Sequence, residues 1–240
     1  MRFFEIDGPV IQFLNKVADL MWLNVLTMVC CIPVFTAGAS FTAMHYMALK
    51  IVRDEECYIT KGFFHSFKEN FKQSTILWLI MMLVAAILGI DLYIIEKSGI
   101  EFNNIFRMII LALAVMAAFT AAMVFPLQAK FANPVKATIK NAFTVGILQF
   151  PKTFLMLAML SFPVVLCLVT WRLFPVAFMF GLSLPAYLSA ILYNKTFKKM
   201  EQQFLDAGEQ EEEADQEPDP EEDERIFKDE ADESVVVDEN

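Results

Sequence analysis

An apolar run over residues 17–52 constrains this chain more than any other feature of its sequence. The run reads VADLMWLNVLTMVCCIPVFTAGASFTAMHYMALKIV and is interrupted near its middle by Pro33 and Gly38. An unbroken helix of this length would measure roughly 54 Å, whereas the hydrocarbon core of a bilayer is about 30 Å thick. Proline removes a backbone donor and glycine accepts backbone angles that other residues resist, so both predict a helix break. We therefore expect an integral membrane protein in which this run forms a helical hairpin, with residues 33–40 at its tip.

Four later apolar segments are each long enough to cross a bilayer. They cover residues 75–95, 105–127, 150–170 and 173–193. The hairpin adds two arms, residues 17–35 and 41–52. The predicted fold is therefore an all-α, polytopic membrane bundle of about six transmembrane helices. If the first run is instead a single kinked crossing, the number is five and the N-terminus lies on the opposite side of the membrane.

The charges divide the chain into two parts. The net charge is −10, but from residue 206 onward the sequence holds 18 Asp and Glu against only Arg225 and Lys228. The tail therefore carries −16 and the preceding body +6. A segment with so much like charge and so few apolar residues does not bury enough surface to fold by itself. We expect a membrane-embedded domain over residues 1–205 and a disordered acidic tail over residues 206–240.

Lysine and arginine are distributed unevenly among the links between the apolar segments. Five lie in residues 50–72, four in residues 130–152 and three in residues 195–199. The opposite links hold only Lys97, Arg107 and Arg172. Because positively charged links remain on the cytoplasmic side, we expect a multi-pass protein of the cell membrane whose C-terminal tail and basic links are cytoplasmic.

The first basic link predicts a cytoplasmic amphipathic helix at the membrane surface, over residues 58–74. Its aromatic residues recur at helical spacing and its lysines take other positions around the helix. The residues concerned are Lys61, Phe63, Phe64, Phe67, Lys68, Phe71 and Lys72. We expect the phenylalanines to enter the inner leaflet and the lysines to bind anionic headgroups. Charge alone would also suit nucleic acid, but the flanking crossings favour lipid, and no nucleic-acid partner is expected.

Few polar side chains lie at bilayer depth, where ionisable groups are costly and usually functional. Those of the first hairpin are Asn24, Thr27, Thr42 and His45. They could line a polar path around the break at Pro33, with Asn24 and His45 meeting across the hairpin. Structural hydrogen bonds between packed helices are the favoured interpretation of the same residues.

Motifs that carry common chemistries are absent from the sequence. It contains no GxxxxGK[ST] loop, no GxSxG elbow and no HExxH pair, and its four cysteines show no CxxC spacing. ATPase, serine hydrolase and zinc protease chemistry therefore have no visible site. We expect no enzyme activity, no catalytic or cofactor-binding residues and no metal site.

Residues 24–70 closely resemble the YesL family of uncharacterised bacterial membrane proteins. The resemblance is carried by the turn at Pro33, Thr36, Gly38 and Ala39, by the segment KIVR at residues 50–53 and by the helix SFKENFK at residues 66–72. Members occur mostly in Firmicutes, often encoded beside carbohydrate ABC-transporter components. The resemblance therefore implies a role in carbohydrate uptake or its regulation, but no site residues.

Two functions are consistent with these features. The first is a non-enzymatic accessory or regulatory protein that packs beside a membrane partner, for which an ABC sugar-transporter permease is the candidate. The second is a small secondary carrier or permease with its polar path near Pro33, since discontinuous helices often mark substrate sites.

Overall fold

The described part of the chain consists of helices joined by short links in the computed structural model, which covers residues 9–55, 58–97, 103–131, 133–169, 172 and 174–216. Its elements are α1 (Pro9–Cys31), the 3-10 turn η1 (Val34–Thr36), α2 (Ala37–Val52), α3 (Ile59–Lys97), α4 (Asn104–Lys130), α5 (Val135–Leu148), α6 (Phe150–Val169), α7 (Phe174–Phe180) and α8 (Ser183–Gln216). No strand occurs in these ranges, so the all-α prediction is confirmed.

Three helices of the described chain are long and apolar enough to cross a membrane: α1 from Val10, α3 and α4. A fourth span results if α5 and the first part of α6, which meet at 102°, are taken as one broken crossing. This is fewer than the six or five crossings expected. The difference arises because α2 has only 16 residues and α7 only 7, both shorter than a full span.

The first apolar run forms a hairpin of α1 and α2, which contact one another. α1 ends at Cys31, and Pro33 takes extended backbone angles before η1. At the other end of the hairpin, Lys16 of α1 forms an ion pair of 2.6 Å with Asp54, just beyond α2. The two chain ends of the hairpin therefore lie together, and the turn occupies fewer residues than the expected 33–40.

Gly38 lies inside α2 and does not break the helix, contrary to expectation. A Cβ atom on Gly38 would lie 2.4 Å from the backbone oxygen of Ser74 and 2.6 Å from the Cβ of Trp78. The missing side chain thus lets α2 approach α3, and the Thr42 and Ser74 hydroxyls meet at 2.8 Å in the same contact. The physical role of Gly38 is close packing, not backbone freedom.

Aromatic rings from three helices pack beside this contact. Phe41 of α2 lies 5.6 Å from Trp78 of α3 and 5.8 Å from Phe125 of α4, measured between ring centroids. Trp78 and Phe125 are 6.1 Å apart. These tilted arrangements are the favoured geometry for aromatic pairs, so the three rings hold α2, α3 and α4 together.

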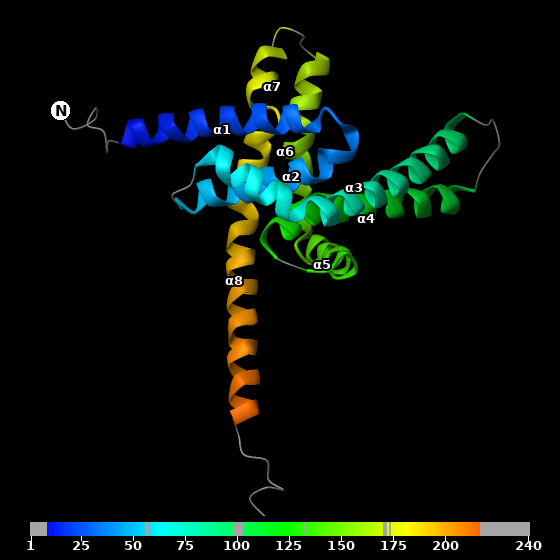
Figure 1. Cartoon of the computed structure of the whole chain (residues 1–240). Helices are drawn as coiled ribbons and strands as arrows, with labels where there is room; N and C mark the ends of the chain where they lie inside the picture. Colours follow the sequence, from blue (N-terminus) through cyan, green and yellow to red (C-terminus); the bar gives the residue numbers. More distant parts are fainter. Residues whose placement is uncertain are drawn as a thin grey trace, which may run out of the picture. The chain divides into compact units, whose positions relative to one another are not determined.

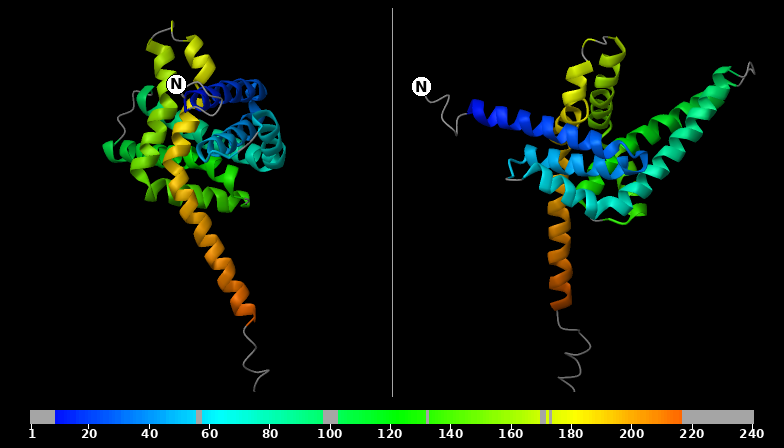
Figure 2. Two further views of the ribbon diagram at one scale, coloured as in Figure 1. Left: turned by 90° about the vertical axis from the view of Figure 1, so that its left-hand side faces the viewer. Right: turned by 45° about the horizontal axis from the view of Figure 1, so that its top comes forward.

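α3 is one continuous helix of 39 residues, or roughly 58 Å. It joins the expected surface helix at residues 58–74 to the expected crossing at residues 75–95 without a break. α4 runs back beside α3, and Figures 1 and 2 show the far part of this pair extending away from the other helices of its unit. The outward-facing residues of this part of α3 and α4 are apolar and exposed, as a surface in contact with lipid requires.

The chain forms two compact units, Met1–Asn194 and Lys195–Asn240, and each is described separately. The last expected crossing, residues 173–193, is interrupted at Gly181 and Leu182 between α7 and α8. α8 then continues to Gln216, so the boundary expected at residue 206 falls inside a helix. Alanine, glutamate and glutamine favour helix, which accounts for this extension. The rest of the expected acidic tail, residues 217–240, lies outside the described residues.

Candidate functional site

Asn24, on α1, forms hydrogen bonds to backbone groups on both sides of the break between α7 and α8. Its amide nitrogen donates to the backbone oxygen of Phe178 at 2.6 Å, and its amide oxygen accepts from the backbone N–H groups of Leu182 and Ser183 at 2.9 and 3.0 Å. Asn24 is completely buried. One side chain therefore satisfies the carbonyl end of α7 and the amide end of α8, both of which would otherwise be costly inside a membrane protein.

The other polar residues of the expected path bond to different parts of the fold. The Thr27 hydroxyl donates to the Leu23 carbonyl at 2.8 Å, within α1. His45 Nδ1 lies 3.3 Å from the hydroxyl of Tyr193, on α8. Thr42 meets Ser74 of α3, as described above. Within the described residues Asn24 and His45 do not bond to one another: Asn24 bonds at the start of α8 and His45 faces Tyr193, ten residues further along the same helix.

A second buried polar cluster centres on Gln128, near the end of α4. Its amide nitrogen donates to Gln73 at 2.7 Å and to Asn70 at 3.2 Å, both on α3. Its amide oxygen accepts from the hydroxyl of Thr138, on α5, at 3.1 Å. Gln128 is only 2% exposed and joins three helices. Nothing in the sequence marks this cluster, because a single glutamine at the end of an apolar segment forms no pattern.

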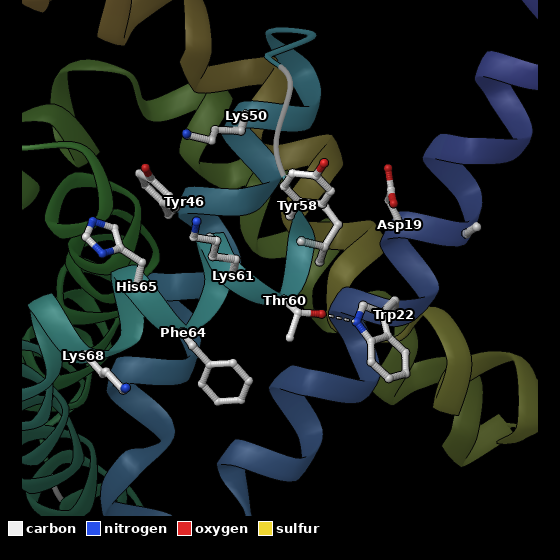
Figure 3. Close-up of a pocket in the computed structure, with 13 residues that line it drawn as sticks. Asp19, Trp22, Tyr46, Lys50, Tyr58, Thr60, Lys61, Phe64, His65 and Lys68 are labelled. Carbon is white, nitrogen blue, oxygen red and sulfur yellow. Dashed lines mark hydrogen bonds between the residues drawn. The ribbon is translucent and has the colours of Figure 1, made fainter.

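A wide hollow of about 1290 Å³ opens between α1, α2 and the start of α3. Figure 3 shows its two walls. Asp19 and Trp22 of α1 form one wall, where the Trp22 indole N–H donates to the Thr60 hydroxyl at 2.8 Å. The opposite wall holds basic and aromatic side chains, namely Tyr46, Lys50, Lys61, Phe64, His65 and Lys68, and Tyr58 lies between the walls.

The charge on the basic wall of this hollow is only partly balanced. Lys50 lies 4.0 Å from Glu55 and 5.1 Å above the Tyr46 ring, and His65 lies 3.7 Å from Glu69. Lys61 and Lys68 are exposed and form no ion pair within the described residues. Such a surface attracts anions.

The phenylalanines of the start of α3 do not share one environment, contrary to the expectation of a common membrane anchor. Phe63 is fully buried, Phe67 and Phe71 are half-buried, and Phe64 is 38% exposed and lines the hollow. Phe63 stacks on Phe67 at 6.2 Å, and Phe67 contacts Phe71 at 5.5 Å. Helical spacing identifies an apolar face but does not distinguish lipid from protein as its neighbour. Lys61, Lys68 and Lys72 are exposed.

The fold and its interior contacts define an all-helical protein with the apolar helices of a membrane protein. Within it, residues 20–92 match a sequence model of the family described as "Protein of unknown function, DUF624". The match begins in α1 and ends in α3, and it includes Asn24, Pro33 and the residues that line the hollow, except Ala18 and Asp19. No curated protein and no solved structure matches the chain.

Proposed function

We propose that this chain is a non-enzymatic accessory protein of the cell membrane that acts through a membrane partner. The observation that carries the proposal is the use of the interior polar side chains. Asn24 bonds to the α7–α8 break, Thr42 to Ser74, and His45 to Tyr193. Groups engaged in this way stabilise helix packing, whereas a transport path needs polar groups available to a substrate.

The partner we favour is the permease of an ABC transporter for carbohydrates, and the process is carbohydrate uptake or its regulation. The support is the resemblance of residues 24–70 to the YesL family. The proposed orientation has the basic links and the C-terminal tail in the cytoplasm, which the distribution of lysine and arginine supports. A permease partner would reach the chain within the bilayer or at these links.

The test is affinity purification of the tagged full-length chain from its native host in mild detergent, with quantitative mass spectrometry of the proteins retained. We expect one permease in stoichiometric amount. An unrelated multi-pass protein carrying the same tag is the control for nonspecific recovery. Recovery of the chain with no stoichiometric membrane protein would contradict the proposal.

The alternative is a small carrier, favoured by the helix interruptions at Pro33 and at Gly181. Purified chain alone in proteoliposomes would then take up its substrate, and Thr27→Val would impair uptake because the hydroxyl would line the path. In the accessory protein, cells carrying Thr27→Val should retain normal uptake, since this hydroxyl bonds only within its own helix. Valine has nearly the same shape, so the variant should fold.

A further inference from the structure

We propose that the hollow between α1, α2 and the start of α3 binds the headgroup of a phospholipid, through a phosphodiester on the lysine wall and headgroup hydroxyls on the Asp19 wall. This inference does not depend on the identity of any protein partner. It assigns a discrete binding site, whereas the basic links alone would give only general attraction to an anionic surface.

The position of the hollow on the hairpin favours a headgroup. The hollow lies near the Lys16–Asp54 ion pair, at the end of the α1–α2 hairpin opposite Pro33. Charged residues of a membrane hairpin collect where it meets water, and tryptophan and tyrosine collect at the same level. Trp22 and Tyr58 line the hollow. A hollow at this level faces the phosphates of the lipids around the protein.

The basic wall fits a phosphate. Lys61 and Lys68 lie on α3 two turns apart, and Lys50 reaches the same wall from α2 (Figure 3). Lys61 and Lys68, which form no ion pair within the described residues, can bind phosphate oxygens by short, charge-assisted hydrogen bonds. The Thr60 hydroxyl already accepts the Trp22 indole N–H, so its own proton remains available to donate to a ligand.

The opposite wall restricts the kind of headgroup. Asp19 carries a carboxylate that accepts hydrogen bonds and repels a second anion. A headgroup whose free end carries hydroxyls therefore fits better than a bare phosphate monoester. Phosphatidylglycerol has both features, a phosphodiester and two free hydroxyls, whereas phosphatidic acid has only the phosphate. The tail of the lipid would leave the hollow past Phe64, which is exposed at its edge.

The test titrates the full-length chain in detergent with phosphatidylglycerol and counts bound lipids by native mass spectrometry. Two variants remove the same charge: Lys61→Gln/Lys68→Gln in the hollow, and Lys72→Gln/Lys140→Gln at exposed sites that do not line it. We expect the first pair to weaken binding roughly tenfold or more and the second less than about twofold. Equal weakening by both pairs would show general surface charge and would overturn the site.

Two further arms test the chemistry of the ligand. Phosphatidylglycerol should bind more tightly than phosphatidic acid, and Asp19→Asn should remove this preference. If phosphatidic acid binds as tightly to the unaltered protein, the assignment of the Asp19 wall is wrong. Glycerol 3-phosphate should not displace the lipid at equal concentration. Displacement would identify a soluble phosphate ester, not a lipid, as the ligand.

Discussion

Replacement of Gly38 by alanine should strongly destabilise the protein. The new Cβ would lie 2.4 Å from the Ser74 carbonyl oxygen, about 1 Å inside ordinary van der Waals contact. Because Ser74 O and Trp78 Cβ belong to α3 itself, the neighbour cannot yield by turning a flexible side chain. The two helices must separate, and a shift of that size would stretch the 2.8 Å contact between Thr42 and Ser74 beyond hydrogen-bonding range.

The magnitude follows from these two losses. Overpacking of a close contact costs about 1 to 3 kcal/mol, and loss of a buried hydrogen bond about 0.5 to 1.5 kcal/mol. We expect Gly38→Ala to lower the free energy of unfolding by about 2 to 4 kcal/mol. For a chain of this size, each kcal/mol lowers the midpoint of thermal unfolding by about 2 to 4 °C, which gives a decrease of roughly 5 to 15 °C.

The assay is the fraction of detergent-solubilised, full-length protein that remains monodisperse after heating, measured by size-exclusion chromatography. Gly89→Ala is the matched control, because Gly89 lies in the same long helix as Ser74 and its Cβ would meet nothing within 4 Å. The control should melt at the unaltered temperature or slightly above it, since alanine favours helix. If both variants melted within about 2 °C of one another, the close approach of α2 and α3 would be refuted.

Three other outcomes follow from the structure. Asn24→Leu should lower thermal stability at least as much as Gly38→Ala, because it removes three hydrogen bonds, one to a backbone carbonyl and two from backbone N–H groups. An unchanged melting temperature would mean that the α7–α8 break does not depend on this amide. Gln128→Leu should cost about 1 to 3 kcal/mol in the same heating assay, since its partners on two helices lose their bonds. Single cysteines can replace Glu96 or Lys140 in a background without the native cysteines, and intact cells can then be treated with a membrane-impermeant thiol reagent. The cysteine at position 96 should react and the cysteine at position 140 should not. Equal labelling at both positions would contradict the proposed orientation.

Patterns within short segments predicted much of the fold. Apolar length predicted the all-helical class but too many crossings, and Pro33 marked the end of α1. The role of Gly38 could not be predicted from these local patterns. Its position beside a proline suggested a break, but its role is set by Ser74, which lies in another helix. Only the packing of two helices reveals why a side chain is not tolerated there.

The partners of the interior polar groups could not be predicted either. Asn24 and His45 were identifiable as polar groups among apolar ones, but Leu182 and Tyr193 gave no sign that they would meet them. The backbone N–H of Leu182 is available to Asn24 only because α8 begins at the next residue. The hollow likewise combines Asp19 with residues of α2 and α3, and it is the return of the chain after Pro33 that brings them together.

The bonds of Asn24 have a consequence for how the protein is made. Asn24 lies 154 residues before Phe178 and 159 before Ser183, yet it bonds to both. Synthesis therefore completes α1 long before the groups that Asn24 bonds to in α7 and α8 exist. Until α7 and α8 arrive, the amide needs water, a chaperone or another transient donor and acceptor to replace them. Asn24 can thus complete these bonds only late in synthesis, and a chain that stops before residue 178 lacks all three backbone groups to which this side chain bonds.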